Sequence, residues 1–214
     1  MMKKVTICGI TDMADDRVCI GGYDLNTHQF IRIMENNHHL TSQCLLNPNK
    51  LIATGSIATL NISEQQPIKV PPHIEDTNII LQSSEVIKKL NRDQLYPLFR
   101  NESSRSLTDI FGTGIESIGG HPVIPEGMVS RSMGLLLGRE CEIYLDHQMK
   151  KRCNIIDCSG AEYRNIPVSA RDEIDSPLGS FINSLIFVGL TRLWKKDTLS
   201  EPYYWMIVPC LLPI

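Results

Sequence analysis

The segment 17–33, with the sequence RVCIGGYDLNTHQFIRI, constrains the fold more than any other part of the chain. Two runs rich in β-branched and aromatic residues flank a polar connection, DLNT, whose Asp, Asn and Thr side chains favour turns. This pattern predicts a β-hairpin. The first strand contains Gly21 and Gly22, and a glycine pair inside a strand indicates a bulge, a barrel bend or a close approach of another part of the chain.

Other strand-like runs occur at the spacing of a small barrel or sandwich. Residues 5–10 precede the hairpin, Asn47-Pro48-Asn49 predicts a turn, and residues 51–62 predict a bent strand or a second hairpin. The strand pattern returns in five later runs, at 135–145, 152–158, 163–168, 181–193 and 203–212. The run from residue 181 is also compatible with a short helix.

The middle of the chain has a different character. Residues 83–100 (SSEVIKKLNRDQLYPLFR) predict a helix, because apolar residues recur on one face, serines at the start can cap it and Pro97 limits its far end. Residues 101–132 are rich in Gly, Ser, Pro and Thr without a clear period, which predicts a long connection. We therefore expect a first β module over 1–81, a helical and variable connection over 82–132, and a second β module over 133–214.

Composition limits the possible functions. The chain has 214 residues, of which 42% are hydrophobic and 21% charged, as in an ordinary soluble domain. Its net charge of −3 gives no general argument for nucleic-acid binding, although a local basic groove is compatible with it. The seven scattered cysteines predict reduced, mostly buried thiols. The apolar run at the N-terminus is too short for a signal peptide or a membrane span, which predicts a cytoplasmic location.

Motifs for metal binding or catalysis are weak. Cys153 and Cys158 lie outside the usual zinc-knuckle spacing, and the glycines at 112–120 do not fit a phosphate-binding loop. The sequence also lacks a GxSxG nucleophile motif. One arrangement keeps an enzyme open, since a cleft that gathered His73, Glu75 and Asp76 around a metal would suit a nuclease. The prediction is nevertheless a non-catalytic protein with no cofactor and no metal site.

Basic and aromatic residues give a clearer pattern. Several arginines lie in or beside predicted strands, basic clusters stand at 150–152 and 195–196, and aromatic residues are interleaved with them. Rings and cations on a barrel face bind single strands, because bases stack on rings while Lys and Arg contact phosphates. The alternative is that the rings are core residues and the arginines pair with carboxylates. The candidate nucleic-acid-binding residues are Arg17, Arg32, Lys150, Lys151, Arg152, Arg192 and Trp194.

Three blocks of the sequence resemble the dual OB-domain family. RVCIGG at 17–22, followed by FIR at 30–32, is similar to the "RCVAG…WIRP" opening of that family, with Phe30 in place of its tryptophan. PHIEDTN at 72–78 is similar to its "HPEN"-like segment, and GLTR at 189–192 with YYW at 203–205 is similar to its closing strand pair. The resemblance implies two consecutive OB-like barrels in a prokaryotic protein of defence or mobile-element systems.

The expected fold class is therefore mainly β with minor α, with two small OB-like β-barrels joined by a helical and loop segment. The resemblance implies an accessory protein that binds single-stranded DNA or RNA. One alternative is a protein-interaction or regulatory module that docks a neighbouring effector protein, and a second is a nuclease or nucleotide-processing enzyme. The expected partners are single-stranded nucleic acid or a protein, without a membrane, and the sequence leaves the oligomeric state open.

Overall fold

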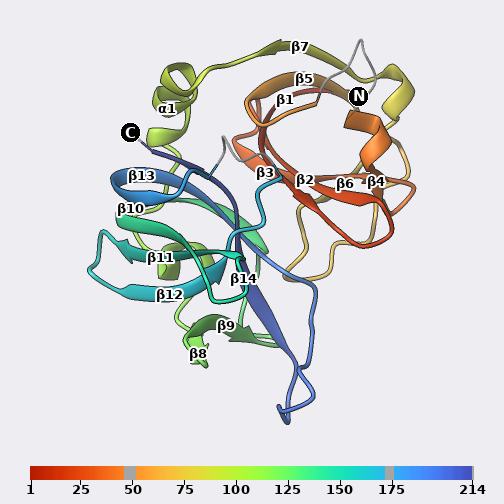
Figure 1. The fold of residues 1–214 in the computed structure, drawn as a ribbon. Coiled ribbons are helices and arrows are strands. Elements are labelled where there is room, and N and C mark those ends of the chain that lie inside the picture. Colours follow the sequence, from red (N-terminus) through yellow and green to blue (C-terminus); the bar gives the residue numbers. More distant parts are fainter. Residues whose placement is uncertain (46–51, 172–175, 214) are drawn as a thin grey trace.

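The structure, a computed structural model, describes residues 1–45, 52–171 and 176–213. This part of the chain is mainly β, with two seven-stranded sheets and two short α-helices, α1 (Arg92–Arg100) and α2 (Leu107–Phe111). Figure 1 shows one module for each sheet, the first at the upper right and the second below it to the left. The prediction of two β modules with little helix is confirmed. None of the described helices is long and apolar enough to cross a membrane.

The first sheet has the strand order β6-β3-β4-β2-β1-β5-β7, with an additional pairing of β2 with β3. Its strands are β1 (Met2–Asp12), β2 (Arg17–Asp24), β3 (Gln29–Glu35), β4 (His38–Thr41), β5 (Ser56–Asn61), β6 (Asp76–Asn78) and β7 (Glu85–Lys89). Short 3-10 helices, η1 (Ser42–Leu45) and η2 (Leu81–Ser83), occur between them. The sheet curls, so that in Figure 1 β5 lies at the top of the first module and β6 and β4 at its lower side.

The predicted hairpin is confirmed, because β2 and β3 pair antiparallel from Ile20 opposite Ile33 to Asp24 opposite Gln29. The second hairpin considered for residues 51–62 is not formed. The described part of this run holds a turn at Gly55 followed by one strand, β5. The turn predicted at residues 47–49 lies outside the described residues.

The second sheet has the order β12-β11-β10-β13-β14-β9-β8. Its strands are β8 (Glu116–Ile118), β9 (His121–Pro125), β10 (Met133–Leu145), β11 (Lys151–Asp157), β12 (Glu162–Pro167), β13 (Gly179–Leu190) and β14 (Tyr203–Leu212). A bridge between Val168 and Val208 joins the end of β12 to β14. Strands β10 to β14 thus follow the five-stranded path of an OB barrel, in which the first three strands form a meander and the last two return beside it. The run from residue 181 belongs to a strand and not to a helix.

The helix predicted over 83–100 is wrong in its first half. Residues 85–89 form β7, which pairs with β5, so backbone pairing across the chain decides the conformation where helical spacing was only approximate. Helix α1 begins at Arg92 and is capped by Asn91. The Asn91 side chain accepts from the backbone N–H of Gln94, and the Gln94 side chain accepts from the backbone N–H of Asn91. Pro97 lies inside α1 and does not end it.

The segment 82–132 is shared between the two sheets. It supplies β7 to the first sheet and β8 and β9 to the second, with α1 and α2 between them. Figure 1 shows β7 and α1 passing over the top of the molecule from the first module to the second.

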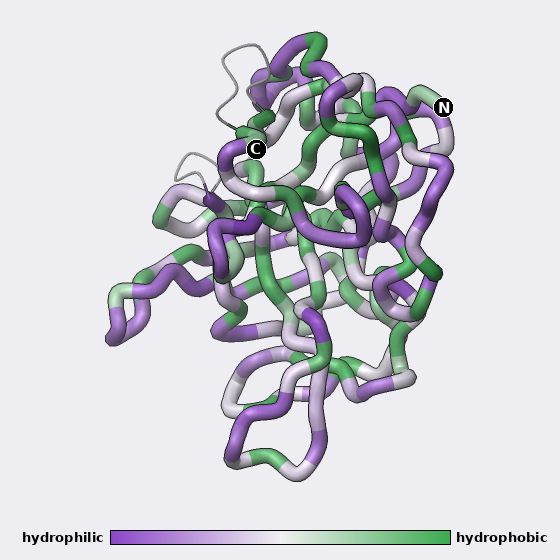
Figure 2. The backbone as a smooth tube through the Cα atoms, turned by 90° about the vertical axis from the view of Figure 1, so that its right-hand side faces the viewer, coloured by the Kyte–Doolittle hydropathy of each residue, from purple (hydrophilic) through white to green (hydrophobic). Residues whose placement is uncertain are grey.

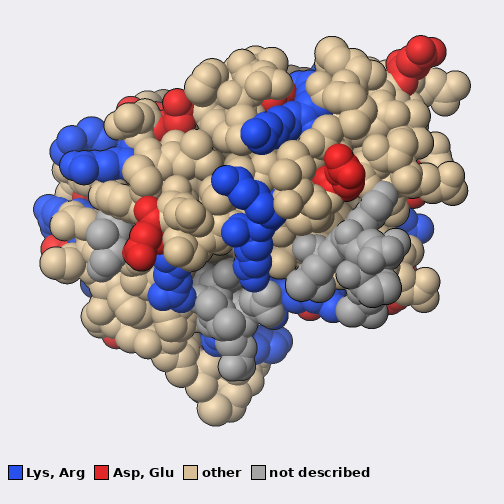
Figure 3. All heavy atoms as spheres, turned by 90° about the horizontal axis from the view of Figure 1, so that it is seen from above, with Lys and Arg blue, Asp and Glu red and all other residues tan. Residues whose placement is uncertain are grey.

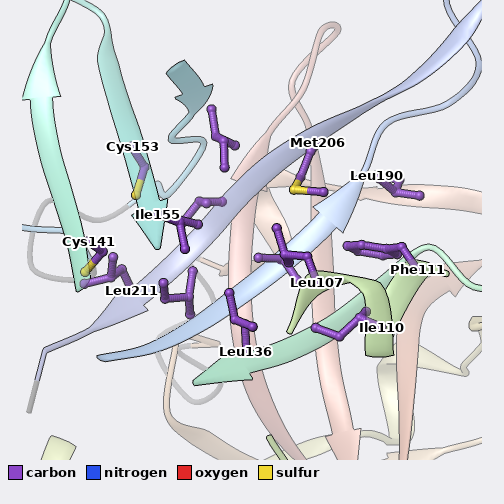
Figure 4. Close-up of a cluster of buried hydrophobic side chains, with 14 of the residues drawn as sticks. Leu107, Ile110, Phe111, Leu136, Cys141, Cys153, Ile155, Leu190, Met206 and Leu211 are labelled. Atoms are coloured by element: carbon purple, nitrogen blue, oxygen red, sulfur yellow. The ribbon is translucent and has the colours of Figure 1, made fainter. Parts of the chain in front are cut away.

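Three apolar clusters hold the molecule together. One fills the first module, with residues such as Val5, Ile20 and Leu60. A second fills the second module, where α2 directs Leu107 and Phe111 at the strands (Figure 4). Figure 2 shows the same division, with apolar stretches along the strands and hydrophilic ones in projecting loops.

The third cluster joins the two modules. It contains Tyr23 from β2, Phe99 from α1, and Leu185 and Phe187 from β13, all nearly fully buried. Shared burial of large side chains fixes the modules against each other, because separating them would expose this apolar surface to water.

The glycine pair of the hairpin serves both sides of β2. A Cβ atom at Gly21 would lie 2.6 Å from the Cε1 and Cζ atoms of Phe187, and one at Gly22 would lie 2.5 Å from Cγ1 of Val5. Gly9, which pairs with Gly21 across the strands, would also meet the Phe187 ring, at 2.9 Å. Successive residues of a strand face opposite sides, so Gly21 admits the second module while Gly22 allows tight packing inside the first.

Candidate functional site

The seven residues predicted to bind nucleic acid fall into two groups. Arg17, Arg32 and Arg192 lie at the junction of the modules, whereas the other four lie in the second module, Lys150 and Trp194 on connections between strands and Lys151 and Arg152 at the start of β11. Two members of the first group, Arg32 and Arg192, share contacts with four further residues at the junction. We call this set the junction network, and it consists of Arg32, His73, Glu75, Asp76, Ser132 and Arg192.

Arg32 is the centre of the junction network. It lies on β3 opposite Asp76 of β6, where the two strands run parallel, and only 4% of the residue is exposed. The Nη1 atom of Arg32 donates to Asp76 Oδ1 at 2.7 Å and lies 2.9 Å from His73 Nδ1. Its Nη2 atom donates to Ser132 Oγ at 2.7 Å. A buried guanidinium needs such partners, since an unpaired charge in the interior is strongly unfavourable.

The network crosses from one module to the other through Ser132 and Arg192. Ser132, just before β10, donates through its backbone N–H and its hydroxyl to the two carboxylate oxygens of Glu75, each at 2.9 Å. Arg192, just after β13, donates through Nη2 to Asp76 Oδ2 at 2.8 Å. Asp76 is therefore shared by two arginines. Burial raises the pKa of Asp76, but the charges and hydrogen bonds of Arg32 and Arg192 outweigh this and lower it.

The protonation state of His73 follows from its neighbour. A guanidinium can only donate, so Nδ1 of His73 accepts from Arg32 and the proton of the neutral ring lies on Nε2. Burial, together with the charges of Arg32 and Arg192, lowers the pKa of His73 to about 3. The same causes lower the pKa of His39 to about 4, with Arg17 adding to the effect. Both imidazoles are therefore neutral at neutral pH.

Arg17 lies at the edge of this region. Its Nη1 donates to the backbone oxygen of His39 at 2.9 Å, and the residue is half-buried. Arg32 has no comparable access to solvent. Arg192 does, since 52% of its side chain is exposed beyond its bond to Asp76.

The gathering of His73, Glu75 and Asp76 that a nuclease would need is present in space, but with different chemistry. The two carboxylates and the imidazole face Arg32, Arg192 and Ser132. Within residues 1–45, 52–171 and 176–213, no three His, Cys, Asp or Glu side chains are grouped so as to hold a metal ion.

The second group surrounds the β13–β14 connection, residues 191–202, which projects at the lower end of Figure 1. Its base is a narrow ribbon, in which the backbones of Trp194 and Tyr203 exchange two hydrogen bonds of 3.0 Å. The indole Nε1 of Trp205 donates to the Trp194 backbone oxygen at 3.2 Å. These bonds fix the backbone of Trp194, and 54% of the residue is exposed.

Aromatic and basic side chains meet on this ribbon. The ring centroids of Trp194 and Trp205 lie 5.6 Å apart with an interplanar angle of 56°. The Nζ atom of Lys196 lies 4.1 Å from the Trp205 centroid, a cation–π contact, and His121 of β9 meets the same ring edge-on. We call Trp194, Lys196, Trp205 and His121 the ring cluster.

The β10–β11 loop brings further basic residues to this end of the barrel. Asp146 organises the loop by accepting from the backbone of Lys150 at 3.0 Å and from Nε of Arg152 at 2.8 Å, bonds that lower its pKa to about 2. Burial lowers the pKa of His121, and both Lys196 and Arg152 add to this, so the two cations lie near the same ring. Lys150 is exposed, and Lys151 donates to the Ser176 backbone oxygen at 3.1 Å.

Sequence reasoning selected Trp194 and Arg152 but did not select Lys196, Trp205 or His121. Lys196 was visible as part of a basic pair, and Trp205 as part of an aromatic run. Their relation to Trp194 depends on the register of the ribbon, and His121 comes from β9, which was not predicted as a strand.

The opposite end of the molecule carries mixed charges. Figure 3 shows the face seen from above, where Lys and Arg side chains form separate patches with Asp and Glu side chains between them. The described basic residues make no continuous track on this face.

Comparison with known protein families shows what this chain is similar to. Residues 3–209 match the family model described as a dual OB-containing domain, which covers nearly the whole chain and both modules. No curated protein matches the sequence.

Proposed function

We propose that this chain, which belongs to the dual OB-containing domain family, binds single-stranded nucleic acid through the ring cluster and the basic loops beside it. The observation that carries the proposal is Trp194, a large ring that is 54% exposed yet held by the ribbon beside Trp205 and Lys196. An exposed and ordered indole flanked by cations suits a nucleobase, which stacks on the ring while its phosphates meet Lys and Arg.

The position of the cluster supports this function. OB folds bind oligonucleotides with the face of their second and third strands and with the loops that join strands 1–2 and 4–5. In the second module these loops are the β10–β11 loop, with Lys150, and the β13–β14 connection, with Arg192 and Trp194, while Lys151 and Arg152 begin β11 directly after the first loop. Three of the seven predicted residues thus stand on the two loops that an OB barrel uses, and two more lie directly beside them.

Arg17 and Arg32 have a different place in the proposal. Arg32 is buried with three partners, so we assign it to the support of the junction and not to direct contact. Arg17 is half-buried at the edge of the junction and contributes positive potential. The binding would take place in the cytoplasm of a prokaryotic cell, in the defence or mobile-element setting that the family resemblance implies.

Fluorescence anisotropy with a labelled oligo-dT strand tests the proposal. We expect binding that weakens steeply with salt, because phosphate contacts release counterions. Trp194→Ala should weaken it by about 1–3 kcal/mol through loss of stacking. Ile68→Ala is the control, since Ile68 is 88% exposed on the first module. Absence of salt-sensitive binding, or equal affinities of the Trp194→Ala variant and the wild type, would refute the proposed function.

A second candidate function is docking of a partner protein, and the outer face of the β10–β13 region favours it. Across four strands the register aligns Glu162, Ile156, Glu140 and Ile182 in one row. Ile182 is 67% exposed, and the row borders a hollow of about 540 Å³ that Glu142 also lines. Carboxylates repel phosphate, so this part of the barrel face suits a basic polypeptide with an apolar anchor.

A pull-down separates this candidate from the first. Recovery of one stoichiometric protein by the wild type but not by Ile182→Glu, with no oligonucleotide binding at low salt, would favour docking. Oligonucleotide binding that Ile182→Glu leaves unchanged would favour the ring cluster.

A further inference from the structure

We infer that Asp76 of the first module positions Arg192 of the second for contact with a phosphate, so that the binding site needs both modules. This inference rests on the proposed function. In this role the junction network orients a phosphate-binding side chain, in addition to holding the two modules together.

Arg192 stands at the entrance of the β13–β14 connection, two residues before Trp194 in the sequence. Thr191 is fixed by backbone and side-chain bonds to Trp205, of 2.9 and 3.1 Å, so the chain at this point has a defined path. A long arginine side chain could still point in many directions. The 2.8 Å bond from Nη2 to Asp76 Oδ2 selects one of them while 52% of the side chain stays exposed.

Asp76 is itself well fixed. Its backbone pairs with Arg32 in the parallel β3–β6 register, and Arg32 binds its other carboxylate oxygen at 2.7 Å. Arg32 is in turn tied to Ser132, which Glu75 holds from the first module. The carboxylates of Asp76 and Glu75 balance the two guanidiniums of the network, so what the network supplies at Arg192 is a fixed orientation and not an excess of charge. An anion at the exposed face of Arg192 would therefore meet a guanidinium already held in one orientation, which reduces the entropy lost on binding.

The sign of one mutational effect separates positioning from simple electrostatics. Asp76→Asn removes a negative charge next to the site, which by Coulomb's law alone should strengthen phosphate binding. If Asp76 positions Arg192, the same change should weaken binding, by about fivefold for a typical contact coupling. Asp12→Asn is a matched control, because Asp12 also pairs with an arginine, Arg171, and the change removes the same charge.

A double-mutant cycle separates positioning from a general loss of structure. In anisotropy titrations with labelled oligo-dT, Asp76→Asn should weaken the wild type but have little further effect in an Arg192→Ala background. A purely structural defect would reduce affinity by the same factor in both backgrounds. Tighter or unchanged binding by Asp76→Asn, or equal effects in the two backgrounds, would overturn the inference.

A second variant keeps the test decisive if Asp76→Asn does not fold. Arg192→Lys keeps the positive charge but cannot span Asp76 and a phosphate with a planar fork, so its affinity should fall toward that of Arg192→Ala. Wild-type affinity for Arg192→Lys would count against positioning. If these variants contradict the positioning role of Asp76 but the wild type still binds oligo-dT in a salt-sensitive and Trp194-dependent way, the proposed function stands. If the wild-type protein binds no oligonucleotide, both the proposed function and the positioning role are refuted.

Discussion

At the scale of single residues, the hairpin glycines explain most directly how the modules meet. The Phe187 ring lies so close to Gly9 and Gly21 that a Cβ atom at either position would overlap with it. Of the three possibilities that the glycine pair allowed, a close approach applies to Gly21, and a register irregularity of the bulge type also lies opposite the pair, between Ile7 and Gly9 of β1. The sequence could show that space was needed there, but not that a residue 166 positions later would fill it.

Gly21→Ala should therefore destabilise the protein. The new methyl group would lie 2.6 Å from two ring atoms of Phe187, and relieving this overlap should cost about 1–3 kcal/mol. Urea unfolding measures the change. Gly189→Ala is a matched control on β13, the strand that carries Phe187, because its Cβ would meet its nearest atom at an ordinary 3.6 Å. A Gly21→Ala variant as stable as the control would show that the junction yields at little cost.

Buried His73 and half-buried His39 predict loss of stability in acid. The pKa of His73 falls to about 3 and that of His39 to about 4 in the folded protein, against an ordinary value near 6.5. The unfolded chain therefore takes up protons first, so the contribution is complete above about pH 6.5 and declines as the pH falls toward 4. Asp76, whose pKa is also lowered, adds a loss of the same sign at still lower pH.

Urea midpoints at a series of pH values test this prediction. His73→Gln keeps an acceptor for Arg32 but cannot titrate, so its midpoint should depend less on pH between about 6.5 and 4 than that of the wild type. A variant with the full pH dependence of the wild type would show that His73 is not a source of the acid sensitivity.

At the scale of elements, strands were predictable and the connection between the modules was not. The five later runs became β10 to β14, and the hairpin became β2 and β3, because β-branched runs bounded by turn residues depend mainly on local sequence. The helix predicted over β7 was wrong because the apolar residues there suited either period and because the partners of β7 in β5 lie 26 or more residues away. β8 and β9 were not predicted either, since they form only a short hairpin with each other and join the sheet through the distant pairing of β9 with β14.

The candidate site divides in the same way. Residue types on the loops, such as Trp194 with its neighbouring cations, could be selected from the sequence because they follow one another along it. The shared use of Asp76 by Arg32 and Arg192 could not, since those contacts span 44 and 116 residues. Sequence pattern can indicate that a strand arginine is either buried or bound, but only the fold decides between the two.

At the scale of the whole molecule, the interface makes the modules one unit. The third apolar cluster takes side chains from β1, β2, α1, β10, β13 and β14, and the junction network adds the buried ion pair Arg32–Asp76 and the half-exposed pair Arg192–Asp76. Breaking such pairs by removing one partner is costly, so polar and apolar contacts both oppose separation of the modules. A site that depends on Asp76 for the orientation of Arg192 also requires this rigidity.

Equilibrium unfolding should therefore occur in one transition. Both tryptophans, Trp194 and Trp205, belong to the second module, so their fluorescence follows that module, while far-UV circular dichroism follows both. We expect coincident urea curves for the wild type. Phe187→Ala removes the ring between the modules, should cost about 3–5 kcal/mol and should separate the two curves. Leu136→Ala, in the core of the second module, should lower stability but leave the curves together. Separate curves in the wild type, or coincident ones in Phe187→Ala, would mean that the ring does not couple the modules.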